Sequence, residues 1–227
     1  MAPSSPPLRA VIFDFGGVLT FQPTDQDWQA LAEIVGAPLS WFHEEYWRSR
    51  NDYDINRLDG ATYWRNLAGT VGRELTDGDI GKLAAIDNQQ WARENAKVGA
   101  VVRAVHAAGL KIAVLSNMHS DMLRYVRKRF SWFREFDVQV FSCEFGRAKP
   151  SPEIFLHTAR LLGVRPEEAL FVDDRPPNID GAAQAGMKTM LFESTESCVR
   201  LQQLLRDLGV PLQDTVAGKS CGSHGES

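Results

Sequence analysis

Four short stretches of this 227-residue chain end in residues that can handle a phosphate or a metal ion. In the first, the apolar run Val11–Phe13 leads into Asp14, and Gly16 and Gly17 follow. In open α/β sheets, ligands bind beyond the carboxyl ends of the strands. Burying a lone carboxylate there is costly unless a cation, a lysine or a substrate phosphate meets it. Asp14 is therefore a candidate reacting group, although it could also simply cap the next backbone amides.

Three later stretches repeat the arrangement of an apolar run followed by a polar residue. Ser116 and Asn117 follow one run, Lys149 comes after a second, and Asp173 with Asp174 follow a third. If the strands are parallel, all of these residues meet at one edge of the sheet. Carboxylates hold Mg²⁺, a lysine and a hydroxyl contact phosphate oxygens, and a carboxylate can attack phosphorus. Each residue alone could belong to a turn, an exposed loop or a helix cap, but their convergence favours phosphoryl transfer.

The elements that must position these residues alternate between strands and helices. We predict strands over residues 10–15, 111–115, 138–141, 169–172 and 189–192. Helices are predicted near 99–108, over about 120–130, from 152 onward, near 179–185, and up to residue 208. This order predicts an α/β fold with a Rossmann-like core, in which helices cover both faces of a mainly parallel sheet.

Residues 22–95 contain no convincing strand. Trp28, Leu31, Ala32 and Val35 recur at helical spacing, and Thr76 offers an N-cap before another helical run. We therefore predict a small all-helical domain over residues 21–96, inserted into a core made of residues 9–20 and 97–210. Most tryptophans of the insert are expected in its apolar core. Residues 1–8 and 211–227 are expected to form a disordered leader and tail.

Composition narrows the partners and the compartment. The formal net charge of −4 argues against a nucleic-acid surface, and no apolar run is long enough to cross a membrane. The three cysteines, Cys143, Cys198 and Cys221, are odd in number and far apart, which fits reduced thiols better than disulfides or a metal site. The sequence thus predicts a cytoplasmic protein that binds neither nucleic acid nor membrane. It leaves the oligomeric state open.

The four motifs, in this order, resemble those of the haloacid dehalogenase (HAD) superfamily of hydrolases. They are Phe13–Leu19 (FDFGGVL), Leu115–Asn117 (LSN), Ala148–Phe155 (AKPSPEIF) and Phe171–Ile179 (FVDDRPPNI). The resemblance covers roughly residues 9–193, and the helical insert resembles the all-helical cap of that family. The stretch from Ser142–Gly146 to Gly186-Met187 is especially similar to the phosphatase domain of soluble epoxide hydrolases.

The resemblance implies a Mg²⁺-dependent phosphatase that acts on a small phosphorylated metabolite. It implies that Asp14 is the nucleophile that forms an aspartyl-phosphate. It also implies that Ser116 and the backbone at Asn117 bind phosphoryl oxygens, and that Lys149 neutralises charge on the nucleophile and the phosphate. The implied Mg²⁺ ligands are Asp14, the carbonyl of Gly16 and Asp174, with Asp173 in support.

One position departs from the family pattern. Phosphatases of the family usually carry a second aspartate two residues after the nucleophile, which protonates the leaving group, and here that position is Gly16. Losing a general acid typically forfeits about 10²–10⁴ in rate. Three explanations are open. Thr20 or a residue of the cap supplies the proton, the substrate has a good leaving group such as an anomeric or acyl phosphate, or the site binds phosphate without turning it over well.

Two rival functions remain. A metal-independent 2-haloacid dehalogenase also lacks the second aspartate, but such enzymes replace the acid pair, and Asp173 with Asp174 would repel an anionic haloacid. A non-catalytic phosphate-binding or scaffold protein would not need the nucleophile, the lysine and the acid pair together. Substrate identity would reside in the cap, where the segment Trp47–Asp54 either folds over the site or forms a plain polar helix end.

Overall fold

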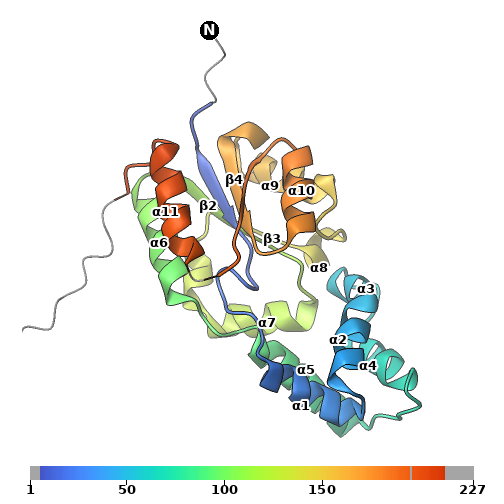
Figure 1. Ribbon diagram of the computed structural model, residues 1–227. Helices are drawn as coiled ribbons and strands as arrows, with labels where there is room; N and C mark the ends of the chain where they lie inside the picture. Colours follow the sequence, from blue (N-terminus) through green and yellow to red (C-terminus); the bar gives the residue numbers. More distant parts are fainter. Residues whose placement is uncertain (1–5, 195, 213–227) are drawn as a thin grey trace, which may run out of the picture.

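A five-stranded parallel sheet forms the centre of the computed structural model, which describes residues 6–194 and 196–212. The strands lie in the order β3-β2-β1-β4-β5 (Figure 1). Their bounds are β1 (Ala10–Phe13), β2 (Lys111–Ser116), β3 (Val138–Phe141), β4 (Ala169–Asp173) and β5 (Lys188–Leu191). The predicted α/β, Rossmann-like class is confirmed. Because β1 lies between β2 and β4, the ends of these three strands are neighbours.

The first strand is shorter than predicted. It ends at Phe13 rather than at residue 15, because the chain turns immediately after Asp14. The amide of Phe15 donates to the side chain of Asp14, and the carbonyl of Phe15 accepts from the amide of Thr20. The turn thus takes the backbone groups that a longer strand would have offered to its neighbours.

Helices cover both faces of the sheet, as the alternating side chains of β1 require. Val11 and Phe13 point into an apolar cluster with helices α6 (Ala96–Ala107), α7 (Ser120–Arg129) and α11 (Ser197–Asp207). Ala10 and Ile12 point into a second cluster, with α9 (Pro152–Leu162) and α10 (Pro176–Gln184). Figure 1 shows α6 and α11 on one side of the sheet and α9 and α10 on the other. A short helix, α8 (Ser142–Phe145), and 3₁₀ turns at Ser131–Glu135 and Pro166–Glu168 complete this part.

The chain between β1 and α6 forms a separate group of helices beyond one end of the sheet (Figure 1). These helices, called here the helical block, are α1 (Asp25–Val35), α2 (Leu39–Arg48), α3 (Arg50–Asp54), α4 (Gly60–Gly69) and α5 (Asp77–Gln90). They bury an apolar cluster of their own, in which Leu31, Phe42 and Trp64 are inaccessible to solvent. Thr76 caps α5 as predicted, and Thr24 caps α1 in the same way.

The ordered part of the chain extends slightly further at both ends than the sequence predicted. Leu8 and Leu212, which we assigned to the disordered leader and tail, pack against the core because both are apolar and lie beside the first apolar cluster. Residues 1–5 and 213–227 of those segments, Cys221 among them, lie outside the described residues. Cys143 and Cys198 are buried free thiols. None of the described helices is both long enough and apolar enough to cross a bilayer.

Candidate active site

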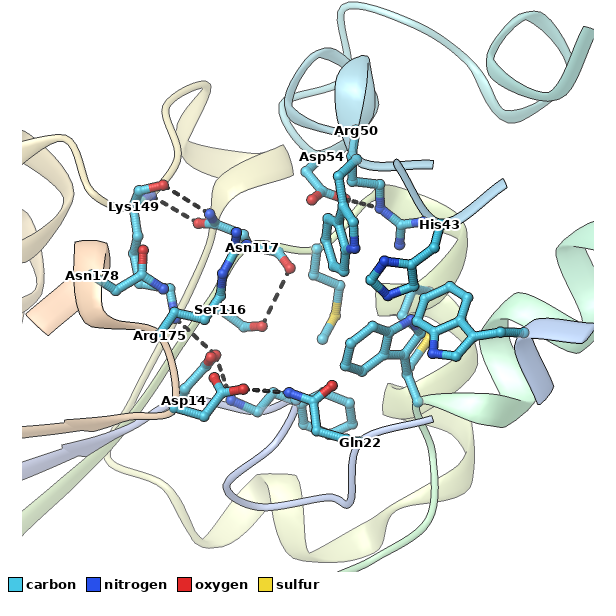
Figure 2. Close-up of a pocket in the computed structure, with 18 residues that line it drawn as sticks. Asp14, Gln22, His43, Arg50, Asp54, Ser116, Asn117, Lys149, Arg175 and Asn178 are labelled. Carbon is cyan, nitrogen blue, oxygen red and sulfur yellow. Dashed lines mark hydrogen bonds and ion pairs between the residues drawn. The ribbon is translucent and has the colours of Figure 1, made fainter. Parts of the chain in front are cut away.

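The polar residues at the strand ends meet at one cavity of about 270 Å³, as the sequence predicted. Asp14 follows β1, Ser116 ends β2, and Asp174 comes directly after β4. Lys149 reaches the same place from the loop between α8 and α9. Figure 2 shows Asp14, Ser116 and Lys149 on one side of this cavity and His43 of the helical block on the other.

Lys149 joins two of the acids. Its ammonium lies 2.8 Å from Asp14 Oδ1 and 2.7 Å from Asp173 Oδ2, and it also donates to the Leu115 carbonyl at 3.0 Å. Burial by itself would lower the pKa of Lys149, but the charges of Asp14 and Asp173 outweigh burial and raise it. Lys149 is therefore a buried permanent cation placed against the predicted nucleophile.

The asparagine after Ser116 has a structural task that the sequence did not reveal. The Asn117 side chain donates to the Lys149 carbonyl at 2.9 Å and accepts from the Lys149 amide at 2.8 Å. This reciprocal pair fixes the loop that carries the lysine. Asn117 also lines the cavity, as does Ser116, whose hydroxyl faces the space beside Asp14 (Figure 2).

Three residues donate hydrogen bonds to the carboxylate of Asp173. Asn178 donates to both of its carboxylate oxygens, at 3.0 and 3.1 Å, and the Arg175 amide donates to Oδ1 at 2.8 Å. Together with Lys149, these donors fix the orientation of the Asp173 carboxylate. Sequence reasoning missed Asn178, and its one visible signal is its place in the first turn of the helix after the acid pair.

The acid cluster fits a divalent cation. Asp14, Asp173 and Asp174 each offer an oxygen within 4.8 Å of the others. Burial raises the pKa of Asp14 well above its ordinary value, and the two neighbouring acids add to the rise against the opposing charge of Lys149. Burial and then the charge of Asp173 raise the pKa of Asp174 to about 6. Three carboxylates against one ammonium leave a negative excess that Mg²⁺ would offset.

The two glycines after Asp14 serve different purposes. Gly17 has a φ of +80°, and a Cβ there would stand 2.6 Å from Asp174 Cγ, so only glycine fits. Gly16 does not have a left-handed backbone, but a Cβ there would lie 3.0 Å from Cε3 and 3.1 Å from Cζ3 of Trp91. At the position where the family resemblance implies a second aspartate, this chain therefore has a bare backbone covered by the Trp91 ring.

Thr20 does not replace the missing acid. Its hydroxyl is fully buried and donates to the Phe15 carbonyl at 3.1 Å, because the chain folds back on itself directly after the glycines. Thr20 is not among the described residues that line the cavity. Of the two candidate sources of a proton named from the sequence, only the helical block remains.

The helical block forms the opposite wall of the cavity. Trp47, Arg50 and Asp54 all line it, so the segment 47–54 does face the site. Trp28 and Trp91 line it as well, although we expected most tryptophans of this region in the apolar core. Trp28 is nevertheless buried in the apolar cluster of the block, as predicted, and Trp47 and Trp91 are partly buried against that cluster. Helical spacing identified the buried face, but it did not show that part of this face also borders a cavity.

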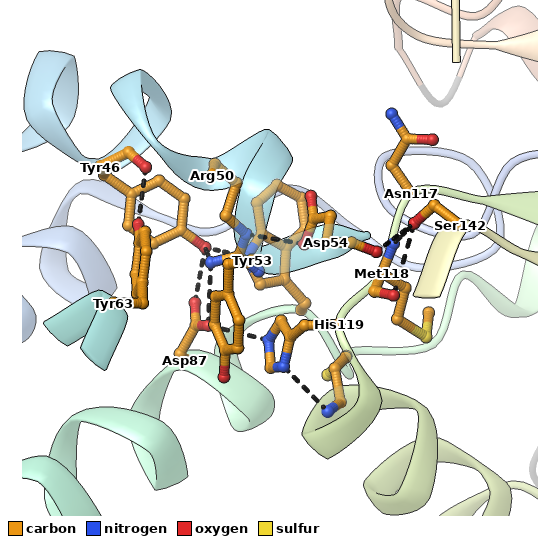
Figure 3. A network of polar contacts seen from close by, with 12 residues as sticks. Tyr46, Arg50, Tyr53, Asp54, Tyr63, Asp87, Asn117, Met118, His119 and Ser142 are labelled. Atoms are coloured by element: carbon orange, nitrogen blue, oxygen red, sulfur yellow. Dashed lines mark hydrogen bonds and ion pairs between the residues drawn. The ribbon is translucent and has the colours of Figure 1, made fainter. Parts of the chain in front are cut away.

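A buried polar network ties the helical block to the core beside the site (Figure 3). Arg50 pairs with Asp54 at 3.1 Å and with Asp87 at 3.0 Å, and His119 Nε2 lies 3.3 Å from Asp87. Although burial opposes it, the Arg50 charge holds the pKa of Asp87 below its ordinary value.

A serine completes this connection. The Ser142 hydroxyl donates to the Asp54 carbonyl at 2.7 Å and accepts from the Met118 amide at 2.9 Å. The helical block is therefore bonded to the backbone immediately after Ser116 and Asn117.

A sequence model of the haloacid dehalogenase-like hydrolases matches residues 8–186. This chain belongs to the haloacid dehalogenase-like hydrolases. Among curated HAD relatives, Bifunctional epoxide hydrolase 2 of Sus scrofa is 24% identical, over 92% of this chain and 40% of that protein. Sesquiterpene phosphatase astK of Aspergillus oryzae is 24% identical, over 87% of this chain and 96% of that protein. The chain spans less than half of some relatives, 19% in the case of Acyl-CoA dehydrogenase family member 10 of Mus musculus.

Solved HAD structures share the fold. A HAD family enzyme from Bacteroides thetaiotaomicron, in complex with magnesium and inorganic phosphate, superposes with a TM-score of 0.65. It is 20% identical, and the match covers 81% of this chain and 93% of that one. An L-2-haloacid dehalogenase from Xanthobacter autotrophicus gives a TM-score of 0.64 at 23% identity, over 85% of this chain and 81% of that one. The same fold therefore occurs in an enzyme that binds magnesium and phosphate and in a dehalogenase, so the fold alone does not identify the reaction of this chain.

Proposed function

We propose that this HAD hydrolase is a Mg²⁺-dependent phosphatase that acts on a small phosphomonoester through an aspartyl-phosphate at Asp14. The observation that carries the proposal is the arrangement of Lys149, whose ammonium lies within 2.8 Å of Asp14 and 2.7 Å of Asp173, beside a third carboxylate. The names of related phosphatases and the magnesium–phosphate complex of a structural neighbour support it.

In the first step, a carboxylate oxygen of Asp14 attacks phosphorus. A bond from phosphorus to Asp14 forms, and the bond from phosphorus to the ester oxygen breaks. Lys149 stabilises the charge that builds on the phosphoryl oxygens, and the Ser116 hydroxyl donates to one of them. Mg²⁺ held by Asp14 and Asp174, with the Gly16 carbonyl, would supply further positive charge at the phosphoryl group. In the second step, water attacks phosphorus, which releases inorganic phosphate and restores the Asp14 carboxylate.

The acid pair separates this proposal from its rivals. Three carboxylates at the end of the sheet would repel a 2-haloacid, whose own carboxylate would have to lie beside them. A scaffold protein would gain nothing from the buried Lys149–Asp14 pair, which is expensive to desolvate.

We also infer that the helical block is the cap of the family. Its residues close the cavity opposite Asp14, so the part of a substrate beyond the phosphate would lie against them. The buried free thiols of Cys143 and Cys198 support a reducing compartment such as the cytoplasm.

The test is a screen of sugar, nucleotide and acyl phosphates with and without Mg²⁺. We expect turnover that requires Mg²⁺ and is lost in Asp14→Asn, because an amide is a far poorer nucleophile than a carboxylate. Asp180→Asn makes the same change on the exposed face of α10 and should leave turnover unaltered. Turnover in Asp14→Asn within tenfold of the parent would refute the proposal.

A further inference from the structure

Three indoles of the helical block stand together at the cavity wall. Trp91 lies 6.1 Å from Trp28 and 6.1 Å from Trp47, centroid to centroid, with interplanar angles of 81° and 75°. Trp28 and Trp47 are 6.4 Å apart at 60°. The three rings pack edge to face against one another and all line the cavity, where they form one aromatic wall, called here the box.

The box lies where the carbon part of an ester must go. The core side of the cavity, with Ser116, Lys149 and Asp174, has the groups that take a phosphoryl group and a cation. An ester whose phosphorus contacts Asp14 therefore directs its remaining atoms toward the helical block, which faces Asp14 across the cavity (Figure 2). The cavity of about 270 Å³ lies below the usual range of about 300–1,000 Å³ for ligand pockets, which favours a small leaving group.

The ring nearest the nucleophile limits the chemistry. Trp91 lies against Gly16, two residues after Asp14, and its indole nitrogen donates to Tyr46 at 3.2 Å rather than into the cavity. The Trp91 ring cannot protonate a departing oxygen. An ester oxygen that lies against this ring receives no proton from it, so a weakly basic oxygen leaves most readily there.

We propose that Trp28, Trp47 and Trp91 form a subsite for a planar aromatic leaving group, so that the substrates of this phosphatase are aryl phosphates. Two chemical arguments support this proposal. An aromatic ring packs favourably on the faces and edges of inclined indoles, and a phenolate is a weakly basic leaving group that needs no acid. The inference rests on the proposed phosphatase function and names the substrate class of the same site.

The central test compares two esters with the same leaving-group pKa. One is a phenyl phosphate, and the other is a fluoroalkyl phosphate whose alcohol matches the phenol in pKa. Because chemical reactivity is then equal, a difference in kcat/KM reports contact with the box. We expect the phenyl ester to be preferred by about tenfold.

Two variants on the same helix locate the effect. Trp47→Leu removes a ring of the box, whereas Trp41→Leu removes a ring that is also partly buried in α2 but does not line the cavity. We expect Trp47→Leu to abolish most of the preference for the phenyl ester and Trp41→Leu to keep it. As a measurement that needs no variant, phenylphosphonate should inhibit at about tenfold lower concentration than methylphosphonate.

Acetyl phosphate separates the failure of this inference from the failure of the proposed function. It has no aromatic ring and an excellent leaving group, so its Mg²⁺-dependent turnover reports on Asp14 chemistry alone. If acetyl phosphate is hydrolysed while the matched esters react equally and the two phosphonates inhibit equally, the aromatic subsite is wrong and the phosphatase stands. If neither acetyl phosphate nor either ester is hydrolysed, both proposals are wrong.

Discussion

Gly16→Asp would restore the aspartate that related phosphatases carry, and we expect it to destabilise this protein instead. The backbone at Gly16 allows any residue, but a Cβ there lies 3.0 and 3.1 Å from two carbons of the Trp91 ring. Those separations are a few tenths of an ångström too short, and a carboxyl group would extend further into the ring. Overpacking of this kind costs about 1–3 kcal/mol. For a chain of this length, each kcal/mol lowers Tm by about 2–4 °C.

A double-mutant cycle tests whether Trp91 is the cause. Trp91→Ala alone loses packing and the hydrogen bond from the indole to Tyr46, so it is destabilising by itself. In the Trp91→Ala background, however, Gly16→Asp no longer meets the ring and should cost little. The two changes should therefore show a coupling free energy of about 0.5–3 kcal/mol.

Thermal unfolding followed by circular dichroism gives the four stabilities of the cycle. Gly81→Asp is a control for the exchange itself, since a Cβ at Gly81 meets nothing within 4 Å. The double variant should also hydrolyse alkyl phosphates better than Trp91→Ala does, because a carboxyl group two residues after Asp14 can then protonate the leaving group. If Gly16→Asp unfolds at the parent temperature and the cycle shows no coupling, the reasoning about Trp91 is wrong.

Three further predictions concern the charges around the site. Because the pKa of Asp174 is raised to about 6, the metal-free protein should lose stability as pH rises through that value. In thermal melts, Mg²⁺ should raise Tm more above pH 6 than below it, and Asp174→Asn should remove this Mg²⁺ shift. Arg50→Met leaves the buried carboxylates of Asp54 and Asp87 without this cation and should lower the free energy of unfolding in denaturant by about 3–5 kcal/mol. The control Arg48→Met, at an arginine that is 71% exposed, should lower it by at most about 1 kcal/mol. Asn117→Ala frees the loop that carries Lys149 and should lower kcat of the Mg²⁺-dependent phosphatase; an unchanged kcat would mean that the loop holds its position without the amide pair.

The sequence by itself determined which strand ends carry the chemistry. A run of buried β-formers followed by a polar residue is a local pattern, and alternating helices make the strands parallel, so their carboxyl ends share one edge. Asp14, Ser116, Lys149 and Asp174 were therefore expected at one edge of the sheet, and in the structure they line one cavity. The sequence also identified the helical block, because helical spacing of apolar residues is visible along a single chain.

Only the tertiary structure decided what lies opposite those residues. The contact between Gly16 and Trp91 joins positions far apart in the chain, and nothing local to either residue reveals it. Trp28 and Trp64 both recur on apolar helix faces, yet one lines the cavity and the other is fully buried in the block. Apolar residues at helical spacing indicate that one face of a helix is buried. Whether protein or a ligand covers that face depends on how the whole helices pack together.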